Sequence, residues 1–274
     1  MMRTLVLAAV ATLLAVPAEA QRVVTLGGDV TEIAYALGAG DSIVCDDQTS
    51  LYPVAATKLP QVGYLRTLAA EGVLSCKPDL IVMSDDAGPP AAVAQLDASG
   101  VRVVHVPNAH SAEAVADKIG AVADALGVHD KGEALKARYR AALADARRKL
   151  DAYRDHPRAI FLMAQGPGGA MAAGRGSAAD AMLTAAGAVN AAGGFDGYKA
   201  MTPEAAVALA PDVIVIADHA VKMLGGMEAF RARPEIALTP AGRSGRIFAM
   251  DALLLLGFGP RTPEALIALA KALH

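Results

Sequence analysis

Aromatic side chains are scarce in this sequence, and positive charge is not in excess. Its 274 residues include no Trp, aromatic residues make up 4%, and 25 Lys and Arg stand against 28 Asp and Glu. With so few rings, a ligand site walled by stacked aromatics is not expected, and each Tyr becomes a candidate site residue. With no polybasic run, neither nucleic acid nor an anionic membrane surface is expected as a partner.

The common catalytic and cofactor motifs are also missing. The sequence has no Gly-x-Ser-x-Gly elbow and no Gly-x-x-x-x-Gly-Lys phosphate loop, and its Gly-Gly pairs lack dinucleotide-site spacing. The six His residues form no pair at metal-ligand spacing. The residue patterns therefore do not predict an enzyme.

Cysteine is limited to Cys45 and Cys76. In an oxidising compartment the two could form a disulfide. They could also be two small buried side chains, because the strict geometry of a disulfide cannot be read from the sequence. The sequence leaves both alternatives open.

The first twenty residues are typical of a cleaved signal peptide. Arg3 is followed by an apolar run at residues 5–16 and by the small-x-small motif at residues 18–20. The run is too short for a stable membrane anchor, and no later stretch offers about 18 uninterrupted apolar residues. Since no Cys follows the run, no lipid anchor is expected. We expect a free periplasmic protein that begins at Gln21; a buried N-terminal helix is the alternative.

After residue 20, short apolar strands alternate with amphipathic helices. Hydrophobic residues make up 54% of the chain, enough for a large core, and the length suggests two domains. Strands are expected at residues 22–26, 42–45, 79–83, 101–106, 159–163, 213–216 and 246–250. A first helix ends at Gly38, and further helices are expected at residues 67–76, 91–98, 111–126, 177–186, 203–209 and 262–273. The alternation predicts an α/β fold with central parallel sheets.

Residues 129–154 differ from the rest because they are highly charged and show no strand pattern. Apolar residues three or four apart form one helical stripe, which comprises Leu135, Tyr139, Leu143, Ala146, Leu150 and Tyr153. About 25 residues make a helix of about 38 Å, long enough to span a small domain. We therefore predict two Rossmann-like lobes, residues 21–127 and 157–274, joined by one long linker helix within residues 128–156. Such a joint allows only modest hinge motion.

The two predicted lobes carry the same motif. Glu71 precedes Pro78-Asp79 and a buried strand, and Glu204 precedes Pro211-Asp212 and another strand, with a constant offset of 133 residues. This repeat indicates two similar lobes with a ligand cleft between them, lined by loops at the carboxyl ends of the strands. Those loops are residues 27–28, 47–64, 84–90, 107–110, 165–176, 193–199, 217–223 and 251–261.

The segment Gly63-Tyr64-Leu65-Arg66-Thr67-Leu68-Ala69-Ala70-Glu71-Gly72 resembles a known family. Further matching landmarks lie at residues 173–180, 197–200, 239–243 and 257–261. Over almost its whole length after residue 20, the chain resembles the HmuT family, the periplasmic haem-binding proteins of bacterial haem ABC importers. The Glu-x6-Pro-Asp motif alone is shared with the wider group of single-helix-hinge binding proteins for cobalamin and siderophores.

The resemblance implies that Tyr64 ligates the iron of ferric haem b. A Tyr is an attested axial ligand of haem iron. Its pKa lies near 10 when free, and both iron and a nearby cation such as Arg66 favour the phenolate. The expected haem and propionate contacts are Arg66, Arg175, Tyr198, Lys199 and Arg261, with His219 and Met223 as candidates for the far side of the iron. Some members of the family stack two haems; no His here matches the second ligand, so one haem is expected.

The resemblance also implies a partner. In the wider group, one exposed Glu on each lobe docks against Arg residues of the membrane permease, which assigns this role to Glu71 and Glu204. The chain is then a monomeric solute-binding protein for an ABC permease and ATPase complex rather than an enzyme. The alternatives are a corrinoid or ferric-siderophore binding protein of the same fold, or an exported haem-modifying enzyme.

Overall fold

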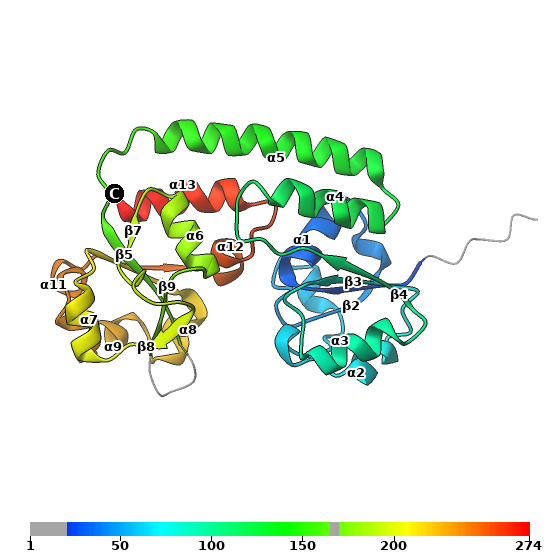
Figure 1. Cartoon of the computed structure of the whole chain (residues 1–274), viewed down its shortest axis with the longest axis horizontal. Coiled ribbons are helices and arrows are strands. Elements are labelled where there is room, and N and C mark those ends of the chain that lie inside the picture. Colours follow the sequence, from blue (N-terminus) through cyan, green and yellow to red (C-terminus); the bar gives the residue numbers. More distant parts are fainter. Residues whose placement is uncertain (1–20, 165–169) are drawn as a thin grey trace, which may run out of the picture.

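The computed structural model describes residues 21–164 and 170–274. The predicted signal peptide at residues 1–20, and residues 165–169 of one predicted cleft loop, lie outside the described residues. Two α/β lobes lie side by side, and one long helix, α5 (His129–Leu150), runs along both of them (Figure 1). The predicted fold class is therefore confirmed. Among the described residues, no helix combines the length and the apolar character needed to cross a bilayer.

The first lobe is built on a parallel sheet with strand order β2-β1-β3-β4. Its strands are β1 (Val23–Leu26), β2 (Ile43–Asp46), β3 (Leu80–Ser84) and β4 (Arg102–Val106). Its helices are α1 (Gly28–Ala36), α2 (Ala70–Ser75), α3 (Pro90–Asp97) and α4 (Val115–Ala125). Every residue of β1 and β3 is buried, as expected for central parallel strands.

The second lobe contains a mixed sheet, with strand order β10-β9-β5-β6-β8 and β7 beside β5. The parallel strands are β5 (Arg158–Ala164), β7 (Val189–Asn190), β9 (Val213–Ala217) and β10 (Ile247–Met250). Strand β6 (Ala170–Ala173) runs antiparallel to its neighbours β5 and β8 (Tyr198–Ala200), in segments that the sequence predicts as loops. The connection from β5 to β6 is too short for a parallel crossover, so the chain returns antiparallel. The central strands of this sheet are parallel, as predicted, and the antiparallel strand β6 was not predicted from the sequence.

The long helices of the second lobe follow the prediction, but several short ones do not. Predicted helices appear as α6 (Ala178–Ala185), α7 (Pro203–Leu209) and α13 (Thr262–Leu273). The unpredicted helices are α8 (Asp218–Met223), α9 (Met227–Arg231), α10 (Pro234–Ala237), α11 (Pro240–Ser244) and α12 (Ala252–Leu256). Residues 217–223 were expected to be a loop. A helix of four to six residues is too short to show an amphipathic repeat, so periodicity could not reveal these elements.

Two predicted helices of the first lobe are shorter than expected. The helix at residues 67–76 is divided into a 3-10 turn (Leu65–Thr67) and α2, because Leu68 is extended and its N–H donates to the carbonyl of Gly88 at 2.8 Å. The helix predicted from residue 111 starts at Val115. The Ser111 hydroxyl instead accepts N–H bonds within the preceding turn, at 3.2 and 3.4 Å.

Helix α5 packs against α4 of the first lobe and α13 of the second (Figure 1). Leu135, Tyr139, Leu143 and Ala146 are buried, so the predicted stripe faces the two lobes. The helix ends at Leu150, four residues earlier than predicted, and its last turn carries Arg147, Arg148 and Lys149. Basic residues at this end favour the helix by complementing its dipole.

A disulfide joins Cys45 on β2 to Cys76 at the end of α2. The structure thereby decides between the two alternatives that the sequence left open. The bond closes a loop with a sequence separation of 31 residues, and this loop contains Tyr64.

Candidate functional site

Tyr64 is presented on a tightly held turn of the first lobe. The preceding residue, Gly63, has φ +107°, a conformation that favours glycine. The Gly63 carbonyl accepts from the Gln48 N–H at 2.9 Å, and the Tyr64 carbonyl accepts from the Thr67 N–H at 2.8 Å. The Tyr64 side chain is 45% exposed, while Leu65 next to it is buried. The backbone is thus fixed and the phenol is free to meet a ligand.

Arg66 lies on the same turn and is paired with a carboxylate. Its Nη2 donates to Asp86 at 2.7 Å, and Asp86 follows the carboxyl end of β3. The Arg66 side chain remains 58% exposed, so a second anionic group can still approach it. The carbonyl of Leu65 also accepts from the Gly88 N–H at 2.9 Å, which fastens the turn to the loop after β3.

Tyr198 on β8 of the second lobe lies close to these residues. Its pKa is raised, first because of burial and further by the neighbouring Tyr64 and Asp86, while the positive charge of Arg66 opposes the shift. The charges of these first-lobe residues therefore act on the Tyr198 phenol of the second lobe. Strand β8 aligns Tyr198 with Ala173 on β6, so a sheet edge rather than the predicted loop holds this phenol.

Arg175 and Lys199 also lie at the β6–β8 side of the second lobe, and both have partners. The Arg175 Nε donates to Asp196 at 2.7 Å, which raises the Arg175 pKa and lowers that of Asp196. The Lys199 ammonium lies 4.9 Å from the ring centroid of Phe195. The Arg175 side chain is still 63% exposed, so a carboxylate ligand can compete for it.

Arg261 is held more firmly than any of the other predicted contacts. Its Nε and Nη2 donate to the two carboxylate oxygens of Glu32 at 3.0 and 2.8 Å, and its guanidinium lies 3.6 Å from the ring centroid of Tyr52. The Glu32 carboxylate raises the Arg261 pKa against the opposing effect of burial. No sequence pattern connects Glu32 with Arg261, because the two lie 229 positions apart.

His219 and Met223 lie on the short helix α8 rather than on a loop. The His219 side chain is 51% exposed, with its Nδ1 3.8 Å from Asp218, and Met223 is 52% exposed. Both are accessible, and neither has a contact that assigns it to the iron.

Glu71 and Glu204 occupy equivalent places in the two lobes. Each is exposed and sits in the first turn of a short helix, α2 and α7 respectively, where the helix dipole favours a carboxylate. The two helices lie on different lobes, on the side of the molecule away from α5 (Figure 1). Their placement agrees with a pair of contacts to one flat partner.

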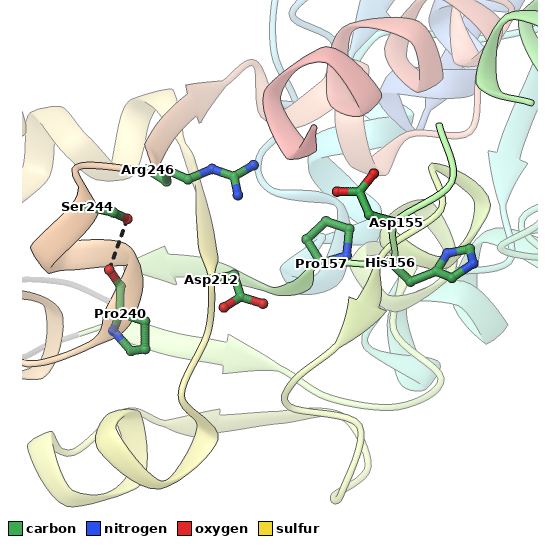
Figure 2. Close-up of a pocket in the computed structure, with 7 residues that line it drawn as sticks. All are labelled: Asp155, His156, Pro157, Asp212, Pro240, Ser244 and Arg246. Atoms are coloured by element: carbon green, nitrogen blue, oxygen red, sulfur yellow. Dashed lines mark hydrogen bonds between the residues drawn. The ribbon is translucent and has the colours of Figure 1, made fainter. Parts of the chain in front are cut away.

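Two of the cavities lined by described residues lie away from Tyr64. The larger, about 490 Å³, is lined by Asp155, His156, Pro157, Asp212, Pro240, Ser244 and Arg246. Figure 2 shows these side chains around the amino ends of β5, β9 and β10. The second, about 400 Å³, adjoins it at the end of α5. Ligands of open α/β sheets bind at the carboxyl ends of the strands, so the Tyr64–Tyr198 region remains the candidate site.

The sequence reading missed a group of buried charged residues near the start of α1. Asp29, Glu32, Asp46, Asp47 and Lys118 are all nearly inaccessible. Lys118 forms an ion pair with Asp29 and donates to Asn108 at 2.8 Å. Charged side chains are almost never fully buried unless they are paired. Asp29, Glu32 and Lys118 lie in apolar stretches around Val30, Ile33 and Ile119. This position in the sequence could have indicated that they are buried.

Comparisons with known proteins agree on the class of the molecule. A family model described as periplasmic binding protein matches residues 23–254. The periplasmic haem-binding protein RhuT of Roseiflexus sp. RS-1, solved in apo form, is 41% identical, with 93% of this chain and 98% of that chain covered and a TM-score of 0.89. BhuT, solved with two haems, is 44% identical, with coverage of 92% and 97% and a TM-score of 0.87. A vitamin B12-binding protein of Vibrio cholerae is 27% identical over 93% of this chain and 89% of its own length.

Proposed function

Because the chain belongs to the periplasmic binding protein family, we propose that it captures ferric haem between its two lobes and delivers it to an inner-membrane ABC permease. The observation that supports this proposal is the exposed phenol of Tyr64, held on a hydrogen-bonded turn of the first lobe. The likeness to RhuT and BhuT supports haem as the ligand. The proposed role is binding and transfer, with no reaction on the porphyrin.

Tyr64 is the proposed iron ligand. Ferric iron is a hard acid that suits an anionic oxygen, and a phenolate serves as an axial ligand in known haem proteins. Iron binding itself favours loss of the phenol proton, and the guanidinium of Arg66 adds positive charge on the same turn. Part of that charge is balanced by Asp86.

The propionates are the proposed partners of the exposed basic groups. Arg66 and Arg175 are the strongest candidates, since both keep more than half of their side chain accessible and a guanidinium can hold a carboxylate with two parallel bonds. Lys199 and Tyr198 extend the same side of the second lobe. Arg261 remains a predicted propionate contact, although its guanidinium already binds the Glu32 carboxylate. His219 and Met223 stay candidates for the far side of the iron.

Export and docking complete the proposal. Residues 1–20 would be removed as a signal peptide, residues 21–127 and 157–274 would form the lobes, and residues 128–156 would link them. The chain would act as a monomer in the periplasm. Glu71 and Glu204 would then contact the permease, one from each lobe, once haem is bound.

A hemin titration tests the ligand and its stoichiometry. We expect a shifted Soret band that saturates at one haem per chain. Tyr64→Phe removes the phenol oxygen and keeps the ring. It should lower haem affinity by more than 10- to 100-fold, the loss that is typical when a group that orients a metal ligand is removed. It should also change the high-spin ferric spectrum. Tyr153→Phe, at the far end of α5, is the matched control and should leave both unchanged. An unaltered spectrum in Tyr64→Phe would mean that a residue other than Tyr64 ligates the iron.

The alternative within the class is a corrinoid, which the similarity to a vitamin B12-binding protein favours. The same titration with cyanocobalamin, and with a ferric siderophore, distinguishes the ligands. Saturable binding of either without a Soret shift by hemin would support the alternative. Conversion of hemin to a ring-opened product would instead support an exported haem-modifying enzyme.

A further inference from the structure

The two lobes meet in a buried ion pair near the middle of the molecule. Glu32 on α1 belongs to the first lobe, and Arg261 comes just before α13 of the second (Figure 1). The Arg261 fork donates to both carboxylate oxygens of Glu32, and its backbone N–H donates to Oε1 at 3.3 Å. The Glu32 side chain is 5% exposed and that of Arg261 is 21% exposed. A two-bond pair of this kind fixes orientation as well as distance.

The same guanidinium reaches the loop that carries the candidate ligand. Tyr52 lies over it at 3.6 Å from ring centroid to Cζ, a cation–π distance. Tyr52 belongs to the chain segment between β2 and Tyr64, and the two ends of this segment are joined by the bond from the Gln48 N–H to the Gly63 carbonyl. Arg261 therefore connects the second lobe both to α1 and to the segment that ends at Tyr64.

Close backbone packing surrounds this ion pair. A Cβ atom at Gly28 would lie 2.8 Å from Leu253 Cδ1 of the second lobe, and one at Gly259 would lie 3.3 Å from the Glu32 carboxyl carbon. The Lys118 ammonium of the first lobe also lies 3.4 Å from the Gly257 carbonyl. We call Glu32, Arg261 and Tyr52 the interlobe clasp. It is a second connection between the lobes, separate from α5.

We propose that Glu32 is a positioning residue for ligand binding: acting through Arg261, it fixes the angle between the lobes and so the position of Tyr64 relative to the second lobe. A single long helix can bend gently, so α5 alone leaves the lobes the freedom of a modest hinge motion. A second buried contact removes that freedom. The part of this inference that concerns haem rests on the proposed function, whereas the part that concerns lobe geometry does not.

Distance measurements on haem-free protein test the clasp directly. Nitroxides on Gln95→Cys of α3 and Val207→Cys of α7, both exposed, report the separation of the lobes, and the native cysteines are paired with each other. In Glu32→Gln we expect a broader distance distribution than in the wild type. Glu133→Gln makes the same chemical change in an exposed pair with Lys136 and should leave the distribution unaltered.

Haem release provides the functional measurement. Glu32→Gln should release haem about tenfold faster than the wild type. This is the lower end of the 10- to 100-fold loss of affinity that follows removal of a group that orients a metal ligand. The Soret position should not change, because Tyr64 still binds the iron. If Glu32→Gln does not fold, Glu32→Gln/Arg261→Gln removes both charges and avoids a lone buried ion; it should give the same broad distribution. A wild-type distribution in either folded variant would overturn the proposal. Absence of haem binding by the wild type would overturn the proposed function, and the distances would still decide the role of the clasp.

Discussion

Asp46 shows at the scale of one residue how burial changes a charge. It ends β2, is fully buried, and neither carboxylate oxygen has a hydrogen-bond partner among the described residues. Burial, with a smaller contribution from Asp47, raises its pKa to about 7. Its neighbour Asp47 accepts N–H bonds from Gly27 and Thr49 at 2.7 and 2.8 Å, which oppose the effect of burial on its own pKa.

A pH-dependent stability follows from Asp46. An unfolded Asp loses its proton near pH 4, whereas Asp46 in the folded protein keeps it until about pH 7. Because the folded state binds more protons in this window, stability should fall as the pH rises from about 4 to 7, by up to about 1.4 kcal/mol per pH unit. Asp46→Asn should remove this slope and exceed the wild type in stability at neutral pH.

Denaturant unfolding between pH 4 and 8 measures the effect of Asp46→Asn. Asp145→Asn serves as a control, because Lys149 lowers the Asp145 pKa, so its small contribution has the opposite sign and is lost as the pH falls. Parallel profiles for the wild type and Asp46→Asn would contradict the prediction.

At the scale of elements, the disulfide links β2 to the end of α2 and encloses the Tyr64 turn. Restricting a loop of this length in the unfolded chain stabilises the folded state by about 3–4 kcal/mol in the chain-entropy description. The short elements α2 and the preceding 3-10 turn bury few side chains of their own, namely Leu65, Ala70 and Val73. They depend on such a link more than a long helix would.

Removal of the disulfide is therefore a test at this scale. Cys45→Ser/Cys76→Ser should lower the free energy of unfolding by about 3–4 kcal/mol. Calorimetry or denaturant unfolding measures the loss, and dithiothreitol should destabilise the wild type to a similar degree while leaving the variant unchanged. A wild type that is insensitive to reduction would count against the bond.

At the scale of the whole molecule, the repeat places one exposed Glu on each lobe. In the proposed docking, Glu71 and Glu204 can meet a partner together only if the lobes hold the correct spacing, so docking would depend on the geometry that α5 and the proposed interlobe clasp set. Exposed ion pairs contribute about 0.2–1 kcal/mol each. Two of them at about 0.7 kcal/mol each add up to about 1.4 kcal/mol, which corresponds to about tenfold in affinity.

Glu71→Ala/Glu204→Ala should thus reduce haem uptake into permease-containing vesicles by about tenfold at limiting protein concentration. Haem affinity of the purified variant should be unchanged. Glu228→Ala, another exposed Glu in a first helical turn of the second lobe, is the matched control and should transport normally. Normal uptake by the double variant would remove the docking role.

The sequence by itself determined the alternation of strands and helices, the long charged helix with its apolar stripe and the two-lobed architecture, because these follow from local periodicity and apolar runs. The sequence also indicates Tyr64 as a candidate site residue, because it lies in a Gly-Tyr-x-Arg motif of a chain with few aromatic residues. Its role at the iron stays a prediction.

Only the tertiary structure decided the pairing of Cys45 with Cys76, the antiparallel edge strand that holds Tyr198, and the union of Glu32 with Arg261. Each of these depends on where distant segments come to lie. The Glu32–Arg261 pair joins residues 229 positions apart. Local patterns of charge or hydrophobicity do not predict a contact between residues so far apart in the sequence. The arrangement of the two lobes brings the Glu32 carboxylate on α1 and the Arg261 guanidinium just before α13 together.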